Sequence, residues 1–175
     1  EQHHTQMVRR SIGDSLMKII EKIAIVIVFS SMTWFAFTPT AYAVGVGNSE
    51  HDLRKLLDAI CEVESGCDPS AVGDGGKAIG PYQIWESYWI DACNYSKSDD
   101  LSLDDGYESC IDKEYAEKVV LTYWKRYANE RRLKREPTLE DRARMHNGGP
   151  RAVWAKGKKK QNLDRYWKKV KEAMN

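Results

Sequence analysis

A glutamate between two cysteines is the first feature of this sequence that could do chemistry. Glu64 lies midway between Cys61 and Cys67 in the stretch ICEVESGC. It follows Leu57 and Ile60 at helical spacing, so it belongs to the apolar side of a helix. Burial there disfavours the charged form of a carboxyl group, which lets it hold a proton near neutral pH as a general acid must. The alternative is an ordinary glutamate at a helix end, with both oxygens in solvent.

A second carboxylate follows ten residues later. Asp74 lies in the stretch VGDGG, where glycines flank it on both sides. Glycosidases usually place two carboxylates around the scissile bond, one protonated and one ionised. Exposed and surrounded by backbone amides, Asp74 is the one that we expect to stay ionised. Asp-Gly is also a common hairpin signal, so a plain turn aspartate is the alternative.

The elements that must position these carboxylates are mostly helical. Ser49 is a good N-cap for a helix over 50–65, and Gly66 is a natural residue to end it. The glycines between Val72 and Ile84 argue against a helix and predict a short hairpin. Further helices are predicted over about 85–93, 108–130, 137–146 and 163–174, with an acidic loop over 94–107. The predicted fold class is therefore α+β, mostly α, with a small β-hairpin.

The first 43 residues resemble a secretory signal region rather than part of a folded domain. An uncharged, apolar run from Ile23 to Phe37 precedes TPTAYA, whose small residues match the A-x-A arrangement that signal peptidase cleaves. We expect cleavage after Ala43, and an uncleaved anchor is the alternative. Met17 would begin a signal of ordinary size, which places residues 1–16 upstream of it. Residues 44–175 then form one secreted domain.

Charge is unevenly spread within this domain. Residues 151–175 contain nine Lys and Arg residues against two Asp and Glu, whereas residues 44–150 carry more acidic than basic side chains. A basic end could approach an anionic polymer such as bacterial wall or nucleic acid. The alternative is the solvated face of a terminal helix.

All four cysteines lie in residues 44–175. An even number in a secreted chain favours disulfides. Three pairings are possible, and proximity in sequence favours Cys61–Cys67 and Cys93–Cys110. Their spacing, with no histidine nearby, fits a zinc site poorly, so we expect no metal and no cofactor.

At these positions the sequence resembles the invertebrate-type lysozymes, the group that includes destabilase. The resemblance covers roughly residues 53–152 and rests on four blocks in the family's order: ICEVESGCDP, GPYQIWESYWIDAC, LTYWKRYA and ARMHNGGPRA. It implies a lysozyme-like fold. It also implies hydrolysis of the β-1,4 bond between N-acetylmuramic acid and N-acetylglucosamine in peptidoglycan.

The resemblance implies a role for each carboxylate. Glu64 matches the family's general acid, and Asp74 is the candidate between that block and PYQI for the second carboxylate. In the family's mechanism this aspartate attacks the anomeric carbon or stabilises its positive charge, with retention of configuration. The segment around Asp74 is shorter and richer in glycine than in the family, and the family is normally denser in cysteine.

Five residues are candidates for binding the substrate: Tyr82, Gln83, Trp89, His146 and Asn147. The first three could offer stacking and hydrogen bonds to N-acetyl sugars, although core packing is the alternative for Trp85 and Trp89. His146 and Asn147 are placed near the cleft by the resemblance, and helix capping is their alternative role. Some relatives also cleave γ-glutamyl-lysine isopeptide bonds with a serine and this histidine, but no serine here is an unambiguous partner.

We therefore predict a secreted, bacteriolytic muramidase that acts on peptidoglycan as a monomer. It should bind no nucleic acid and should have no stable membrane association after signal cleavage. Two alternatives stay open: a lytic transglycosylase that uses Glu64 alone, and a wall-binding protein that has lost turnover.

Overall fold

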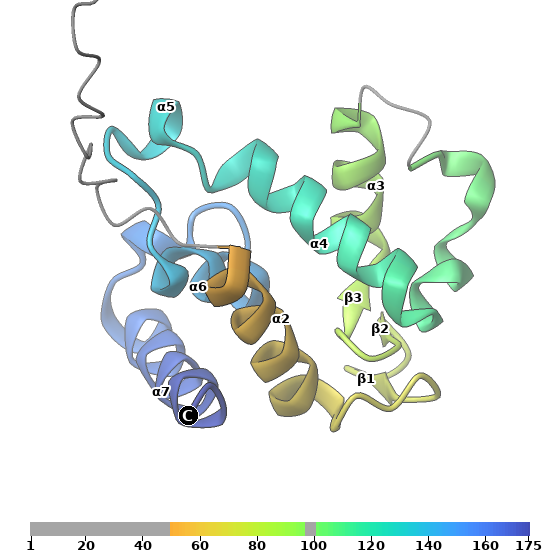
Figure 1. Ribbon diagram of the computed structural model, residues 1–175, viewed down its shortest axis with the longest axis horizontal. Helices are drawn as coiled ribbons and strands as arrows, with labels where there is room; N and C mark the ends of the chain where they lie inside the picture. The colour runs from red at the N-terminus through yellow and green to blue at the C-terminus, as the bar shows by residue number, and fades with distance from the viewer. Residues whose placement is uncertain (1–49, 97–100) are drawn as a thin grey trace, which may run out of the picture. The chain divides into compact units, whose positions relative to one another are not determined.

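The computed structural model describes residues 50–96 and 101–175 (Figure 1). The predicted signal segment and its cleavage point after Ala43 lie outside the described residues. Within the described part, α2, α3, α4, α6 and α7 surround an apolar core, and three short strands form a sheet beside it. None of the described helices is long and apolar enough to cross a membrane.

Helix α2 spans Glu50–Ser65, the range predicted from the sequence. Glu50 and Asp52 in its first turn suit the positive end of the helix dipole. Leu56 and Ile60 are fully buried and anchor its apolar side. The helix ends at Gly66, which takes the left-handed conformation (φ +66°) that glycine adopts without strain.

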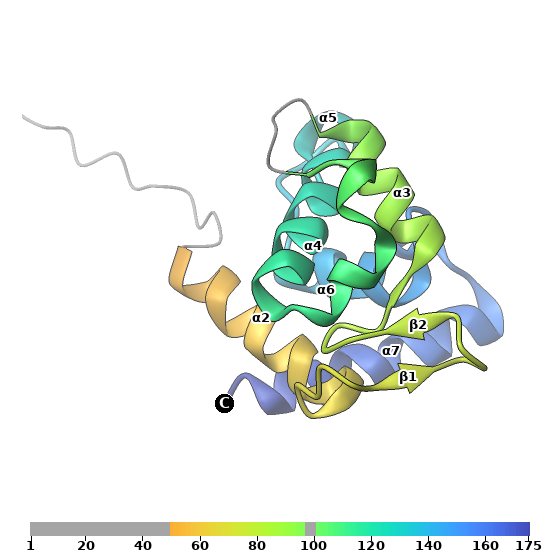
Figure 2. The same cartoon turned by 90° about the vertical axis from the view of Figure 1, so that its right-hand side faces the viewer.

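The sheet is antiparallel and has the order β1-β2-β3. Its strands are β1 (Val72–Gly73), β2 (Ala78–Ile79) and β3 (Ile84–Trp85). Figure 2 shows β1 and β2 near the C-terminal end of α2. Gly80, after β2, has no room for a side chain, because a Cβ atom there would lie 2.2 Å from the carbonyl oxygen of Cys110. The sheet is therefore pressed closely against the segment that contains Cys110.

Five further α-helices follow: α3 (Glu86–Tyr95), α4 (Lys113–Tyr127), α5 (Glu130–Leu133), α6 (Leu139–Gly148) and α7 (Gly157–Ala173). Short 3-10 helices lie between them: η1 (Leu103–Asp105), η2 (Tyr107–Ile111) and η3 (Ala152–Trp154). The single helix predicted over 108–130 is three elements, because Asp112 and Asn129 leave helical geometry and cap the next helix with their side chains. Helix α7 begins six residues before the predicted start at Leu163.

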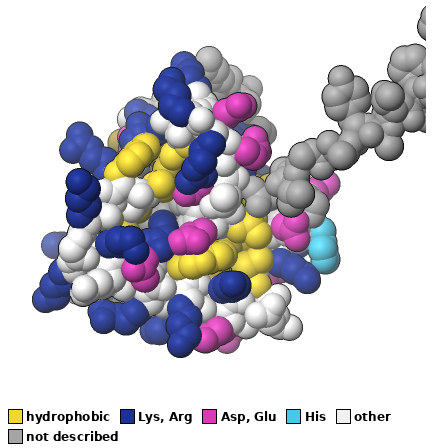
Figure 3. Space-filling model, turned by 90° about the vertical axis from the view of Figure 1, so that its left-hand side faces the viewer, with side chains coloured by type: hydrophobic (Ala, Val, Ile, Leu, Met, Phe, Trp, Pro, Cys, Tyr) yellow, Lys and Arg dark blue, Asp and Glu magenta, His cyan; other side chains and the backbone are white. Residues whose placement is uncertain are grey.

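The core joins the helices in two groups. Helix α2 packs against α6 and α7, and α3 packs against α4. The largest fully buried side chains include Tyr82, Leu56, Ile60, Ile84 and Met145. The Lys and Arg side chains of α7 are all exposed, and Figure 3 shows basic side chains spread over one face of the molecule.

Only one of the two predicted disulfides is present. Cys61 and Cys67 are bonded, but Cys93 and Cys110 are free and buried. The prediction of a Cys93–Cys110 disulfide from sequence proximity is therefore wrong for this structure. The thiol of Cys93 instead donates to the carbonyl oxygen of Ser102, with 3.7 Å between sulfur and oxygen. Burial raises the pKa of both thiols, that of Cys110 to about 12, so both stay protonated and poorly nucleophilic at neutral pH.

These two thiols can be counted. We expect a thiol reagent to titrate two cysteines per chain in denaturant without reductant, because only Cys61 and Cys67 are bonded. The same reagent should react slowly with the folded protein, since both thiols are buried and protonated. A count of zero in denaturant would show that Cys93 and Cys110 are joined after all.

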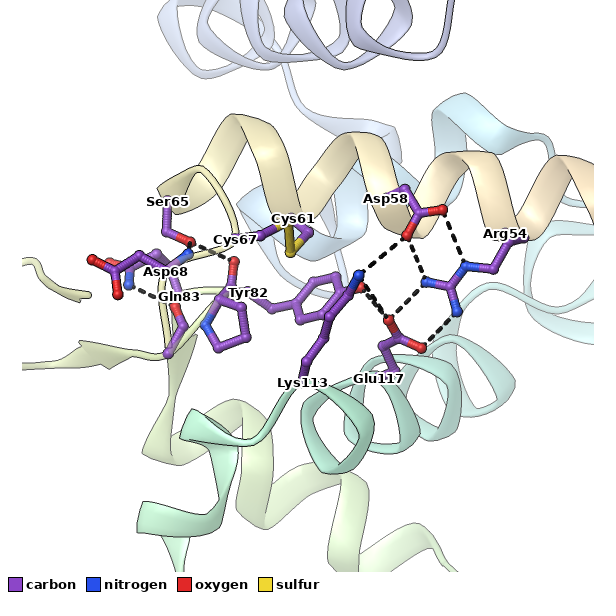
Figure 4. The surroundings of a disulfide bond; sticks show 12 residues. Arg54, Asp58, Cys61, Ser65, Cys67, Asp68, Tyr82, Gln83, Lys113 and Glu117 are labelled. Atoms are coloured by element: carbon purple, nitrogen blue, oxygen red, sulfur yellow. Dashed lines mark hydrogen bonds and ion pairs between the residues drawn. A yellow bond between two sulfur atoms is a disulfide. The ribbon is translucent and has the colours of Figure 1, made fainter. Parts of the chain in front are cut away.

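A polar cluster ties α2 to α4 and holds Tyr82 (Figure 4). Arg54 donates two hydrogen bonds to Glu117, both 2.7 Å, and the hydroxyl of Tyr82 donates a third at 2.8 Å. The Glu117 side chain is only 15% exposed. Burial alone would raise the pKa of Glu117, but the hydrogen bonds from Arg54 and Tyr82 outweigh it and hold the pKa below its usual range. Asp58 also contacts Arg54, at 3.1 Å, but is more than half exposed.

We expect Glu117→Gln to lower the free energy of unfolding by about 2 kcal/mol at pH 7, because it removes the charged acceptor from the buried hydroxyl of Tyr82 and from the guanidinium of Arg54. A lowered carboxyl pKa contributes stability above the unfolded value, and this contribution is lost as the pH falls through the folded value. The difference between variant and wild type should therefore shrink below about pH 4. Urea unfolding at pH 7 and pH 3 measures both effects.

Asp58→Asn is the matched control for this substitution. It removes a carboxylate that contacts the same arginine at an exposed position, and should lower the free energy of unfolding by less than about 0.5 kcal/mol. Equal losses for the two variants, or a loss for Glu117→Gln that is the same at both pH values, would contradict the assignment.

Candidate active site

Glu64 lies in the last turn of α2, one residue before the helix ends. Its side chain is 16% exposed. The hydroxyl of Tyr166 donates to its Oε1 at 2.7 Å, and Nε2 of His146 lies 3.7 Å from the same oxygen. Next to it, the hydroxyl of Ser65 donates to the carbonyl oxygen of Pro81 at 2.9 Å, which joins the end of α2 to the segment before β3. Glu64 is thus a half-buried carboxyl group held by protein contacts.

Asp74 occupies the turn between β1 and β2 and is exposed. Its backbone is left-handed (φ +49°), a conformation that aspartate tolerates better than most residues. The indole N–H of Trp85, on β3, donates to Asp74 Oδ2 at 3.0 Å. At Gly73, directly before it, a Cβ atom would lie 2.2 Å from the amide oxygen of Gln83, so that any larger residue would force the Gln83 side chain to move. The indole of Trp85 thus orients the Asp74 carboxylate, and the side chain of Gln83 lies close to the backbone just before it.

The two carboxylates line one pocket of about 270 Å³. Its lining residues are Glu64, Gly73, Asp74, Gln83, Trp85, His146 and Asn147. A neighbouring pocket of about 350 Å³ shares Gln83, Trp85, His146 and Asn147, and continues along α3 to Asp91. The structure therefore brings both sequence-predicted carboxylates to the same hollow, with room beside it for a longer ligand.

His146 is buried behind this pocket, with its side chain 3% exposed. Its Nε2 lies 3.1 Å from the carbonyl oxygen of Tyr82, which can only accept, so Nε2 carries the proton. Nδ1 of the neutral ring then accepts from the hydroxyl of Tyr88 at 3.4 Å. Burial lowers the pKa of His146, which keeps the ring neutral. Both nitrogens are occupied, so His146 supports the pocket wall and has no nitrogen left to activate a serine.

Two of the predicted substrate-binding residues lie in the core instead. Tyr82 is completely buried, and its hydroxyl is bound to Glu117. Trp89 is 6% exposed, and its indole N–H donates to the hydroxyl of Tyr115 at 2.9 Å. Neither side chain lines the pocket of Glu64 and Asp74. This placement differs from the expected contact with substrate, because the apolar surface of both rings is used for packing.

The pocket wall contains the other predicted residues and one that sequence reasoning did not select. Asn147 is exposed at the end of α6, and Gln83 is half-buried, with its amide donating to the carbonyl oxygens of Ala71 and Gly80. Trp85 is 43% exposed, lines both pockets and binds Asp74. The sequence contains both Trp85 and Trp89 but does not show which of them faces solvent.

Nothing in the described part of the chain suggests a metal centre. Among the residues described, no group of three His, Cys, Asp or Glu side chains is arranged to hold a metal ion. The chemistry that the pocket offers is that of two carboxyl groups in different surroundings, one half-buried and one exposed.

Comparison with known proteins shows which family the chain belongs to. The Destabilase family model matches residues 54–173, which includes the glutamate, the hairpin and all helices from α3 to α7. The chain belongs to the Destabilase family. Invertebrate-type lysozyme 6 of Caenorhabditis elegans is 33% identical over 134 residues, covering 75% of this chain and 90% of the relative. A lysozyme of Meretrix lusoria is 34% identical over 122 residues, covering 68% and 88%.

Solved structures agree with this assignment. The crystal structure of Tapes japonica lysozyme superimposes with a TM-score of 0.52 at 30% identity, covering 68% of this chain and 88% of that one. The Meretrix lusoria lysozyme in complex with Aeromonas hydrophila PliI has a TM-score of 0.50 at 34% identity, covering 65% and 86%. The predicted resemblance to invertebrate-type lysozymes and the lysozyme-like fold are thus confirmed, and at the level of the family so is a lysozyme-type glycoside hydrolase.

Proposed function

We propose that this lysozyme-family protein is a secreted muramidase that hydrolyses the β-1,4 bond between N-acetylmuramic acid and N-acetylglucosamine of peptidoglycan. The observation that carries the proposal is the pocket shared by Glu64 and Asp74. Glycoside hydrolysis needs two carboxyl groups with different protonation, and these two have different surroundings. Glu64 is largely shielded from solvent by α6 and α7, whereas Asp74 lies on an exposed turn.

In this mechanism Glu64 donates its proton to the glycosidic oxygen as the bond breaks. Asp74 stays ionised and attacks the anomeric carbon or stabilises its developing positive charge. The indole N–H of Trp85 fixes one oxygen of Asp74, so that its carboxylate keeps a defined direction. A water molecule then completes the hydrolysis, activated by the carboxylate that Glu64 has become, and the configuration is retained.

The shared wall of the two pockets supports binding of a polysaccharide rather than a single sugar. Trp85 presents an exposed ring on which a sugar can stack, and Asn147 presents an amide for N-acetyl and hydroxyl groups. The wall continues from the carboxylates along α3 toward Asp91. Peptidoglycan chains, which repeat N-acetyl sugars, fit this combination. Exposed Lys and Arg side chains on α7 would favour an anionic wall as the substrate surface.

We expect Glu64→Gln to abolish lysis of bacterial walls, with a loss of about 10³-fold in rate, because an amide cannot donate the proton. Asp74→Asn should lower the rate of lysis about 100-fold or more, because the positive charge at the anomeric carbon is no longer stabilised. The measurement is the fall in turbidity of a wall suspension. Circular dichroism checks that each variant is folded. Glu62→Gln, an exposed glutamate on the same helix turn, is the matched control and should keep full activity.

The outcomes separate the alternatives. Full activity of Glu64→Gln would remove the proposed mechanism. If Asp74→Asn stays active, mass spectrometry of the released fragments decides what remains: anhydro-muropeptides indicate a lytic transglycosylase that needs Glu64 alone, and reducing ends indicate a hydrolase with its second carboxylate elsewhere.

Two substitutions of Trp85 separate its two expected roles. Trp85→Phe keeps a ring for stacking but removes the N–H that binds Asp74, so kcat should fall several-fold while KM changes little. Trp85→Ala removes both and should also raise KM about 5- to 10-fold. Steady-state kinetics on a soluble oligosaccharide of N-acetyl sugars measures both constants. Trp154→Ala, also exposed but outside both pockets, is the control, and an equal effect there would argue against a role for Trp85.

A further inference from the structure

Helix α7 delivers one side chain to the catalytic glutamate. The hydroxyl of Tyr166 donates to Glu64 Oε1 at 2.7 Å, although the two residues are 102 positions apart. Tyr166 is 9% exposed, and its neighbours on the same helix face, Leu163 and Val170, are 2% and 0% exposed. Helix α7 packs along both α2 and α6. The phenol is therefore held in place by the core before any substrate binds.

This hydrogen bond makes the two oxygens of Glu64 different. Oε1 faces the hydroxyl of Tyr166 at 2.7 Å and the ring of His146 at 3.7 Å. Within the described part of the chain, no residue donates a hydrogen bond to Oε2. A carboxylic acid carries its proton on one oxygen, and the oxygen that already accepts from a phenol is the less favourable place for it. Oε2 is therefore the oxygen that carries the transferable proton.

Tyr166 is a permanent donor in this contact. Burial, followed by the charge of Glu64, raises the pKa of Tyr166 well above 10, so the phenol stays protonated over any working pH of the enzyme. His146 cannot take its place. Its ring is neutral because burial lowers its pKa, and its Nε2–H is directed at the carbonyl oxygen of Tyr82.

We propose that Tyr166 is a positioning residue of this lysozyme: it holds Oε1 of Glu64 so that Oε2 presents the proton to the glycosidic oxygen. The same bond then stabilises the carboxylate that remains after the proton has left. This inference rests on the proposed muramidase function and deepens it. It makes α7, which contributes no residue to the wall of the pocket, a part of the catalytic machinery.

The sign of the expected pH effect follows from the bond. A phenol O–H stabilises the ionised carboxyl group, so its removal lets Glu64 keep its proton to higher pH. The other titratable groups around Glu64 are His146 on α6, Tyr88 on α3 and Asp74 across the pocket. All three stay in place when only the Tyr166 hydroxyl is removed. The general acid must be protonated in the free enzyme. In a variant without the Tyr166 hydroxyl, the alkaline limb of the plot of kcat/KM against pH should therefore move to higher pH.

The test is Tyr166→Phe, which keeps the buried ring and removes only the hydroxyl. We expect the alkaline limb to shift upward by about 0.5 to 1 pH unit. We also expect kcat to fall about 5- to 20-fold with KM changed less than twofold, because the acid is less well oriented. NMR titration of the Glu64 carboxyl carbon, assigned by comparison with Glu64→Gln, should show the same upward shift without any turnover.

Tyr127→Phe is the matched control. The hydroxyl of Tyr127 also donates to a carboxylate at 2.7 Å, that of Asp91. Removing this hydroxyl should leave the alkaline limb of the pH profile and the Glu64 titration unchanged.

Reduced stability of Tyr166→Phe, with the pH profile and the Glu64 titration both at their wild-type positions, would overturn the proposal, since Tyr166 would then only pack. If the wild type shows no turnover, or Glu64→Gln keeps it, the muramidase proposal fails instead. In that case the NMR titration of Glu64 still measures the effect of the Tyr166 hydroxyl on this carboxyl group, because it does not require turnover.

Discussion

The way in which α2 ends is the constraint on which the candidate active site depends. Gly66 and Cys67 both take left-handed backbone conformations, and the disulfide to Cys61 closes the turn that they make. The chain is thereby directed from the helix into the hairpin, and Ser65 joins the helix end to Pro81. The hairpin residues Gly73 and Asp74 thereby line the same pocket as Glu64, which lies in the last helical turn. A helix that continued by one more turn would carry the chain away from the position that Asp74 must occupy.

A series of polar contacts supports the pocket from behind. Glu117 and Arg54 hold the hydroxyl of Tyr82, the carbonyl oxygen of Tyr82 accepts from His146, and His146 lies beside Glu64. Each buried polar group in this series has a partner, which is the condition under which such groups are tolerated in a core. The ion pairs between α2 and α4 thus do more than join two helices. They fix the segment between β2 and β3, which lies against the wall of the pocket that Glu64 and Asp74 line.

The two carboxyl groups differ because different kinds of structure hold them. Glu64 is on a helix packed against α6 and α7, and its partners are a buried phenol and a neutral imidazole. Asp74 is on a turn in solvent, and its partner is the indole of an exposed tryptophan. This difference in surroundings is what the proposed division of roles between the two carboxyl groups requires. With a single disulfide in place, the helical core supplies the rigidity that this division requires.

Local patterns in the sequence were sufficient for the bounds of α2, the hairpin and the α+β class, whereas the choice of Glu64 and Asp74 as candidates also required the resemblance of several sequence blocks to a known family. Apolar spacing, glycines and caps act over a few residues, so the chain itself displays them. Only the tertiary structure decided that Trp85 faces the pocket while Trp89 packs in the core, that Cys93 and Cys110 are free, and that Tyr166 reaches Glu64. In the sequence, Tyr166 is one more apolar position on a terminal helix. Its hydrogen bond exists because α7 packs against α2, and a contact across 102 residues depends on packing that no local pattern encodes.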